Sequence, residues 1–577
     1  MRKSFERLRY CFLLLLLLLA TRAHAQTWDW ANTAGNFGPT TNTWGYVTNH
    51  GLAQDNSGNI IVYGEFFDSL RIADTFIVTR TGADHFKSVF LAKFAPSGAR
   101  LWTRVYRHAE GAWSGSLSSQ VQVDTNGDII LAGRADTGFA GQSVPNKHFV
   151  CKMRDDGQLL WMKLFDNAPA LTIDAAGSVY VAVTYYSTFT TSFDNIPVPG
   201  ANQLLLGKLS AGGNALWLKR YPMDDIGNNW MKLQVSPSGS ELLMAGVHSK
   251  SLTIDGIPLT MAATDNWKGF VGRFSVADGA VKKIIPVYYF GNSFFELANA
   301  RWVGNNRIVF TGANNSFPMQ LVVNGVTLDG GFHPTNKFVY TTLMDTAGTV
   351  AWFKVIKAAN PVNGFNTTYS RALEVAGNYI YVAGAAATNS TINGSNINPT
   401  YGLSSSFVAC YDLSGNVVGF TNGGFTHSDN MIVYMVFTPQ QKLFVSGTHR
   451  GWIPGSMTPA FNNLPVPQTG NNMLLFGRLT APGVFTSVPA LDADTRVTLY
   501  PNPARDRMQV TIITTKPAAT RLEIINGVGQ PVLGYEAGVP SLRYSQQVGL
   551  NGLPPGIYYL KVTMGKSSSV QAFVHTR

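Results

Sequence analysis

Cysteine is scarce in this 577-residue chain, which contains only Cys11, Cys151 and Cys410. Cys11 lies in an apolar N-terminal segment, and the other two fall in sequence repeats that are not neighbours. Free cysteine is among the most buried residue types. We therefore predict two buried thiols rather than a disulfide, so that stability comes from a packed core.

Charge is scarce as well, because only 13% of the residues are Asp, Glu, Lys or Arg, and no cluster of Lys and Arg occurs. The formal net charge is +11, and it falls to +7 without residues 1–25, which hold five basic residues and one acidic residue. Proteins that bind nucleic acid gather positive charge in a patch or stripe. We therefore expect no nucleic-acid partner.

Motifs of catalysis and metal binding are missing. The sequence has no His-Glu-x-x-His, Gly-x-Ser-x-Gly, Walker A or Cys-x-x-Cys motif, and its ten histidines are scattered singly. Asp124-Thr-Asn-Gly-Asp128 resembles a calcium loop only in part, because it lacks the bidentate glutamate of an EF-hand, and we interpret it as a turn. We assign no catalytic residue and expect no metal and no cofactor.

Only one long apolar run occurs, Phe12–Ala20, about half of the roughly 20 residues that a membrane-spanning helix needs. Basic residues precede it and Ala23-His24-Ala25 follows it, a pattern typical of a signal peptide that is cleaved after Ala25. We predict a signal peptide at residues 1–25, export through the periplasm, and a mature chain without a transmembrane segment.

Seven copies of one unit fill residues 26–486. In each copy a strand ends in small residues, an insert follows, and the next strand usually reads Phe-Val-small-Lys/Arg-apolar before a glycine turn. The second strands end at Gly64, Gly133, Val183, Gly246, Gly312, Gly384 and Gly447, and four copies place Trp102, Trp161, Trp217 or Trp352 four residues after the turn glycine. Four short antiparallel strands per repeat, without helices, are typical of a propeller blade.

Three features of the repeats carry further predictions. Several inserts contain Asp-Gly or Asn-Gly, as at Asp255-Gly256 and Asn324-Gly325, which predicts an extra hairpin. The repeated tryptophans are interpreted as packing between blades. The third-strand cations are interpreted as partners of turn carboxylates, with a charged ring lining a channel as the alternative; they are Lys93, Lys152, Lys208, Arg273 and Arg478.

The seventh repeat ends near Gly483 without a fourth strand, whereas Trp28-Asp-Trp30-Ala precedes the first repeat. We therefore predict that the strand of Trp30 completes blade seven and hides its edge. These repeats resemble the seven-bladed β-propellers of exported Bacteroidetes proteins. The resemblance implies an all-β fold and says little about activity.

The end of the chain forms a separate unit, with a linker at residues 487–494 and a small domain at residues 495–577. This domain resembles the type A sorting domain of the type IX secretion system, a small β-sandwich. The resemblance implies that a translocon recognises it and that a sortase then removes it and attaches the protein to the cell surface. The motif residues are Pro501, Asn502, Pro503, Gly529, Gly556, Tyr558 and Lys561.

Candidate binding residues lie in the blade-to-blade connections, where aromatic and polar residues suit the faces and edges of sugar rings. They are Trp44, Trp113, Asp225, Trp230, Tyr289, Glu296, Tyr369 and His427. We expect a surface protein that binds an extracellular glycan or protein. The alternatives are a polysaccharide hydrolase or lyase, in which Asp225 and Glu296 act as acid and base, and a structural adhesion protein.

Overall fold

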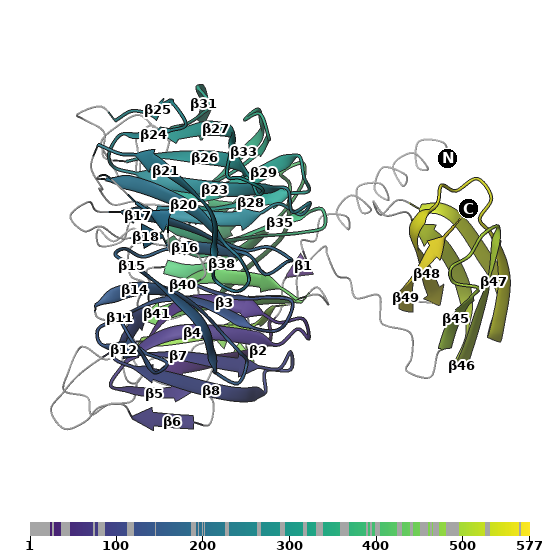
Figure 1. Ribbon diagram of the computed structural model, residues 1–577. Coiled ribbons are helices and arrows are strands. Elements are labelled where there is room, and N and C mark those ends of the chain that lie inside the picture. The colour runs from purple at the N-terminus through teal and green to yellow at the C-terminus, as the bar shows by residue number, and fades with distance from the viewer. Residues whose placement is uncertain are drawn as a thin grey trace, which may run out of the picture. The chain divides into compact units, whose positions relative to one another are not determined.

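The structure is a computed structural model that separates into two compact units, residues 1–484 and residues 485–577. It describes residues 24–25, 28–35, 47–72, 75–78, 87–111, 120–144, 146–185, 192–193, 196–198, 200, 202–224, 230–261, 267–288, 295–314, 320–330, 338–357, 368–387, 390–392, 395–397, 404–423, 430–438, 442–450, 460–461, 464–465, 472–479, 496–525, 531–564 and 567–576. These residues form strands and turns without a helix, so the chain is all-β (Figure 1).

The larger unit is built from antiparallel groups of four strands, which we number sheets 1 to 7. Sheet 1 consists of β3 (Val47–Gln54), β4 (Ile60–Phe67), β7 (Lys87–Phe94) and β8 (Arg100–Arg107). Sheet 2 consists of β10 (Val121–Val123), β11 (Ile129–Ala135), β14 (Lys147–Met153) and β15 (Leu159–Phe165), with β9 (Ala109–Gly111) also paired to β11. Sheet 3 consists of β16 (Ala170–Ile173), β17 (Val179–Tyr185), β20 (Gln203–Leu209) and β21 (Ala215–Pro222).

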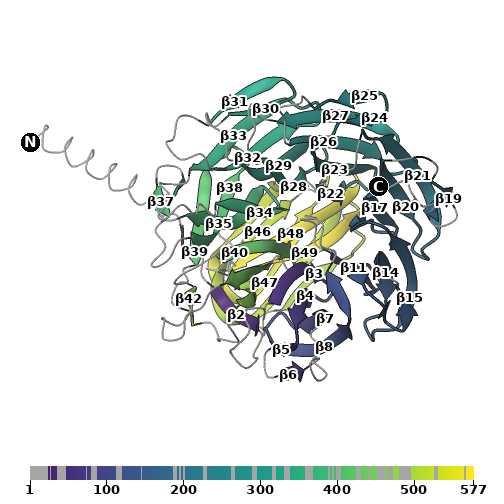
Figure 2. The ribbon, with the colours of Figure 1, turned by 90° about the vertical axis from the view of Figure 1, so that its left-hand side faces the viewer.

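The remaining sheets repeat this order, and Figure 2 shows the sheets following one another around a common centre. Sheet 4 consists of β22 (Trp230–Val235), β23 (Glu241–His248), β26 (Lys268–Ser275) and β27 (Val281–Tyr288). Sheet 5 consists of β28 (Phe295–Val303), β29 (Arg307–Asn314), β32 (Phe338–Asp345) and β33 (Val350–Lys357). Sheet 6 consists of β34 (Tyr369–Ala376), β35 (Tyr379–Ala387), β38 (Ser404–Asp412) and β39 (Val417–Gly423).

Sheet 7 takes its strands from both ends of the unit. It consists of β40 (Asn430–Phe437), β41 (Leu443–Arg450), β44 (Asn472–Leu479) and β2 (Trp28–Gly35). Strand β2 is antiparallel to β44, with Trp30 opposite Arg478. The two-residue strand β1 (His24–Ala25) pairs in parallel with β39 at the edge of sheet 6.

A short hairpin follows the second strand of each sheet. The hairpins are β5 (Ser69–Ile72)–β6 (Thr75–Val78), β12 (Gly138–Phe139)–β13 (Gln142–Ser143), β18 (Ser192–Phe193)–β19 (Ile196–Pro197), β24 (Leu252–Ile254)–β25 (Ile257–Leu259), β30 (Gln320–Val323)–β31 (Val326–Asp329), β36 (Ser390–Ile392)–β37 (Ser395–Ile397) and β42 (Ala460–Phe461)–β43 (Leu464–Pro465). Asp255, Gly256, Asn324 and Gly325 all have positive φ angles, as the tight turns require. The predicted extra hairpins are confirmed.

Three of these hairpins extend the outer edge of the preceding sheet. Strand β30 pairs with β27, β36 pairs with β33, and β5 of the first repeat pairs with β2 of sheet 7. An uncovered edge strand presents unpaired backbone groups to other chains. The hairpins therefore both cover edges and connect consecutive sheets.

The fourth-strand tryptophans connect each sheet to the next. The indole N–H of Trp161 donates to the carbonyl of Ala211, Trp217 donates to Val276, and Trp352 donates to Leu413, each in the turn between the third and fourth strands of the following sheet. Trp30 of β2 makes the same bond to Pro96 of sheet 1, at 3.1 Å. Trp102 packs against the buried cluster between sheets 1 and 2 as well, although its indole nitrogen finds no hydrogen-bond partner among the described residues. The predicted packing role of the repeated tryptophans is confirmed.

The third-strand cations pair with carboxylates, many of them in turns. Lys93 contacts Asp55 at 3.0 Å and Asp155 of the next sheet at 2.8 Å. The other pairs are Lys152 with Asp124 and Asp128, Lys208 with Asp174, Arg273 with Glu241, and Arg478 with Asp29. Asp124 also accepts the amides of Asn126 and Asp128 through one carboxylate oxygen. The five cations therefore pair with carboxylates as the turn interpretation predicts, and none of them is among the described residues that line the central cavity.

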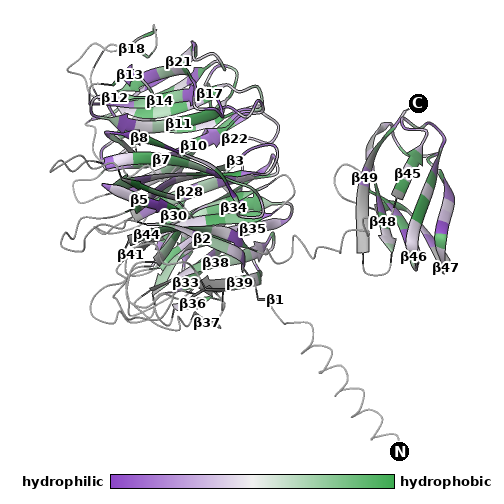
Figure 3. Cartoon of the chain, turned by 90° about the horizontal axis from the view of Figure 1, so that it is seen from below, coloured by the Kyte–Doolittle hydropathy of each residue, from purple (hydrophilic) through white to green (hydrophobic). Residues whose placement is uncertain are grey.

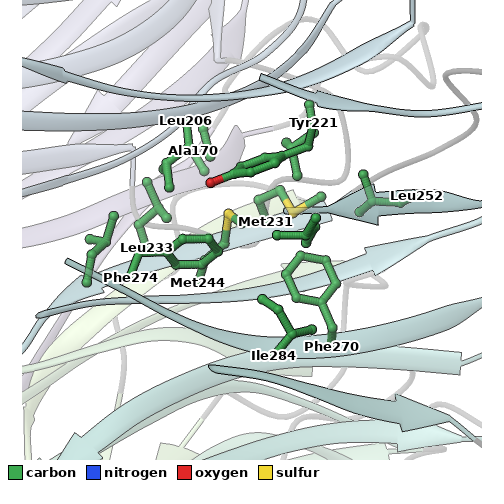
Figure 4. Close-up of a cluster of buried hydrophobic side chains, with 14 of the residues drawn as sticks. Ala170, Leu206, Tyr221, Met231, Leu233, Met244, Leu252, Phe270, Phe274 and Ile284 are labelled. Atoms are coloured by element: carbon green, nitrogen blue, oxygen red, sulfur yellow. The ribbon is translucent and has the colours of Figure 1, made fainter. Parts of the chain in front are cut away.

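Apolar residues fill the spaces between neighbouring sheets. Figure 3 shows hydrophobic residues along strands such as β11, β14 and β34. The cluster between sheets 3 and 4 includes Tyr221, Met231, Met244, Phe270 and Phe274, all less than 8% exposed (Figure 4). Cys151 and Cys410 are buried free thiols in sheets 2 and 6, which confirms the prediction made for them.

The C-terminal unit is one five-stranded sheet. Its strands are β45 (Arg496–Tyr500), β46 (Arg507–Ile525), β47 (Pro531–Gly549), β48 (Gly556–Met564) and β49 (Ser567–His575), in the order β45-β46-β48-β49 with β47 on the other edge of β46. Strand β46 is long enough to pair first with β45 and then with β48. The hydrogen bonds therefore join all five strands continuously around one buried cluster. The sequence does not predict β47.

Candidate functional site

The first strands of the seven sheets line one central cavity of about 410 Å³. Its wall takes residues from β3, β10, β16, β22, β28, β34 and β40. Asn56, in the turn after β3, is exposed and lies on the same wall, so the cavity reaches the surface at the side of these turns. Ligand pockets in proteins have volumes of roughly 300–1,000 Å³. The cavity is therefore large enough for a small molecule or one sugar unit.

Two buried ion pairs join β28 to β34 beside this cavity. Arg301 contacts Glu374 at 2.8 Å, and Arg371 contacts Glu296 at 2.5 Å. The Glu296 side chain has no exposed surface, and the other three side chains are about one fifth exposed. Arg301 and Glu374 belong to the cavity wall. Because each carboxylate has an arginine beside it, the two pairs together add no net charge.

Lys232 of β22 brings a third cation to the same place. Its side chain lies on the cavity wall, and the residue is only 6% exposed. It has neither a hydrogen bond nor an ion pair with any residue that the structure describes. Burial holds the pKa of its amine well below the usual value for lysine, the charges of Arg301 and Arg371 lower this pKa further, and Glu296 offsets a part of the effect.

Most of the binding residues predicted from the sequence lie outside the described residues. These are Trp44, Trp113, Asp225, Tyr289 and His427. Trp230 is the first residue of β22, two positions before Lys232. The predicted residues that the structure describes are Trp230, Glu296 and Tyr369, on first strands β22, β28 and β34, and none of them is among the residues that line the cavity.

Glu296 and Tyr369 are placed next to each other by Arg371. The guanidinium of Arg371 lies 5.5 Å from the ring centre of half-buried Tyr369 and pairs with Glu296. The backbone carbonyl of Glu296 accepts a hydrogen bond from the Tyr340 hydroxyl. A general acid must reach its substrate. A fully buried carboxylate already paired with arginine is suited to positioning Arg371 rather than to proton transfer.

Sequence reasoning missed Lys232, Arg301, Arg371 and Glu374. The sequence does contain a sign of Lys232. In Trp230-Met-Lys232-Leu a lysine stands between two hydrophobic residues of a strand, which is unusual for a basic residue. Lys, Arg and Glu are almost never fully buried unless they are paired.

Within the described parts of the chain, no group of three or more His, Cys, Asp or Glu side chains is placed to hold a metal ion. No helix there is long and apolar enough to cross a membrane.

The C-terminal unit exposes the first part of its predicted motif. Pro501, Asn502 and Pro503 are exposed, whereas the next residue, Ala504, is buried and exchanges backbone hydrogen bonds with Val574 and Thr576. The side chain of Asn502 accepts the amide of Val574 at 3.0 Å. Tyr558 packs on Phe573, and its hydroxyl donates to the Pro554 carbonyl at 2.8 Å. Lys561 contacts Glu523 at 3.4 Å, and Gly529 lies outside the described residues.

Residues 498–576 match the family model of the secretion system C-terminal sorting domain. The end of the chain is thus similar to a type IX secretion signal. The match supports export of the chain to the cell surface or the extracellular space by a type IX secretion system, as found in Bacteroidetes.

Comparison with curated proteins gave no match. Among solved structures, a protein of unknown function from Dyadobacter fermentans is 10% identical with a TM-score of 0.35, over 79% of this chain and 99% of that one. A glycoside hydrolase of family 32 from Bifidobacterium adolescentis is 9% identical with a TM-score of 0.22, over 94% of this chain and 93% of that one. At these TM-scores neither likeness bears on the fold or the activity of this protein.

Proposed function

We propose that residues 26–486 form a seven-bladed β-propeller that, once exported, binds an extracellular glycan or protein without catalysing a reaction. In this proposal residues 1–25 are a signal peptide, residues 487–494 are a linker, and residues 495–577 are removed by a sortase that anchors the protein to the surface. The sheets are the blades, and β2 completes the last of them.

The central cavity is the observation that carries the binding function. All seven first strands contribute to its wall, and it is lined by both amide and charged side chains, including Gln54, Gln122, Gln234, Asn299 and Lys232. Hydroxyl groups of a sugar need such donors and acceptors when they leave water. The candidate residues of the blade-to-blade connections, Trp113 and Tyr289 among them, are proposed as a second contact surface.

Closure of the ring is supported by contacts between the first and last sheets. Strand β3 contacts β40, and the Asn49 side chain donates to Ser446 at 2.7 Å in a buried hydrogen bond. In a closed ring every sheet packs between two neighbours, so no sheet face is left open to another chain. The cavity then has a rigid wall, which reduces the entropy lost when a ligand binds.

A glycan-array screen of the purified chain, combined with analysis of released sugars, tests this function. We expect binding to at least one class of arrayed glycan and no new reducing or unsaturated ends. Released oligosaccharide would overturn the non-catalytic proposal in favour of a hydrolase or lyase. If neither binding nor release is found with glycans or with extracellular protein ligands, the binding function is wrong.

A further inference from the structure

We propose that the central cavity binds a small carboxylate, of the size of a single sugar acid, through the amine of Lys232 and the guanidinium of Arg301. The inference rests on the proposed binding function, because it names the class of ligand that this cavity takes.

The ion pairs around the cavity leave one basic side chain, Lys232, without a partner. Arg301 is balanced by Glu374, and Arg371 is balanced by Glu296. Lys232 has no carboxylate within ion-pair distance among the described residues. Buried charges in proteins are paired or bind an ion, because an isolated one is strongly disfavoured. An anionic ligand supplies the counter-charge that this chain does not provide.

The available donors fit a carboxylate. Lys232 and Arg301 both lie on the cavity wall, from neighbouring first strands β22 and β28. The Nε of Arg301 is buried and donates no hydrogen bond to a described residue. Charge-assisted hydrogen bonds from Lys and Arg to carboxylates are stronger than bonds between neutral groups. The unused Nε of Arg301 and the amine of Lys232 are thus two donors for the two oxygens of one carboxylate.

The rest of the wall fits the polar remainder of a sugar acid. Gln234 and Asn299 line the cavity next to the two cations. The backbone amide of Trp302 donates to the Gln234 side chain at 2.8 Å, which orients that amide. The carbonyl oxygen of the Asn299 side chain is buried without a hydrogen-bond partner in the described chain, so it is available to a ligand hydroxyl.

Binding should be coupled to proton uptake. The titratable groups beside Lys232 or on the cavity wall, within the described residues, are Arg301 and Glu296 of β28, Arg371 and Glu374 of β34, Tyr434 of β40, and Asp55 after β3. Burial and the neighbouring guanidinium groups of Arg301 and Arg371 lower the pKa of Lys232, and an incoming anion raises this pKa back. Affinity for the anion therefore falls as the pH rises, because the protonated amine of Lys232 becomes harder to form.

Titration calorimetry of the purified chain tests the inference, with glucuronate as probe and glucose as its neutral counterpart. Glucuronate should bind about tenfold or more tightly than glucose, since glucose cannot make the charged hydrogen bonds. Measured in two buffers of different ionisation enthalpy, glucuronate binding should take up protons. Lys232→Met should abolish both the preference and the uptake.

The control is Lys282→Met, which makes the same substitution at an exposed position on strand β27. It should bind glucuronate as the parent does. Equal binding of glucose and glucuronate, unchanged in Lys232→Met, would overturn the carboxylate site and leave the proposed binding function intact. Failure of glucuronate to bind overturns the site as well. Should Lys232→Met not fold, the pH dependence and proton uptake of the parent chain decide.

Discussion

The indole N–H of Trp30 donates to the carbonyl of Pro96, and this bond connects the last strand of sheet 7 to the first sheet. The Trp30 ring also lies against the backbone of Gly98, where a Cβ atom would come within 2.9 Å of the ring. Arg478 donates to the same Pro96 carbonyl. One turn of sheet 1 therefore binds two neighbouring strands of sheet 7, β2 and β44.

Replacing Trp30 with alanine should destabilise the larger unit by about 2–3 kcal/mol, slightly less than for a fully buried aromatic ring because this ring is half-buried. The cause is loss of packing against Phe444 and Phe476 together with the bond to Pro96. Chemical denaturation measures the change, with the exposed Leu101→Ala as control. An unchanged unfolding midpoint in Trp30→Ala would mean that the sheets are held together by other contacts.

His248 should make the protein sensitive to acid. Burial lowers the pKa of His248 to about 4, a hydrogen bond between its Nδ1 and the Lys250 carbonyl offsets part of the shift, and Lys268 adds to it. Because the unfolded chain takes up a proton near pH 6.5 and the folded chain does not, stability falls as the pH drops from about 6.5 to 4, by roughly 3 kcal/mol.

Unfolding free energies of the parent and of His248→Asn at pH 7 and pH 4.5 measure this contribution. The loss of stability between the two pH values should be smaller in His248→Asn than in the parent. The exposed His108→Asn should behave like the parent. A parent-like loss in His248→Asn would show that other groups cause the acid sensitivity.

The two buried thiols should be unreactive in the folded protein. Burial raises the pKa of Cys151, and it raises the pKa of Cys410 to about 12, so neither is a thiolate at pH 8. A thiol-specific reagent should label no cysteine in the native mature chain and two after denaturation. Rapid native labelling, or absence of thiols after denaturation, would contradict the structure.

The sequence was sufficient to predict local features that recur. The Asp-Gly and Asn-Gly hairpins, the tryptophan contacts and the cations of Lys93 and Lys152 were visible because each repeat places the same residue in the same environment. Side-chain direction alternates along a strand, so a repeated position implies a repeated contact.

The central charges could not be predicted in this way. Lys232, Arg301 and Glu374 lie on three different first strands. None of them recurs at the same position in the other repeats, so the repeat pattern does not point to them. Their proximity follows only from how the sheets are arranged. Strand β47 was missed for another reason: Gly534, Gly538 and Pro540 interrupt its pattern, and pairing along β46 overrides the weak local preference.

The proposal of an exported protein with a removable sorting tail is tested most directly at its two ends. Mass spectrometry of the protein recovered from the cell surface should find Gln26 as the first residue and no peptide from the segment that begins near Val497. Recovery of surface protein that retains residues 1–25 or ends at Arg577 would contradict the account.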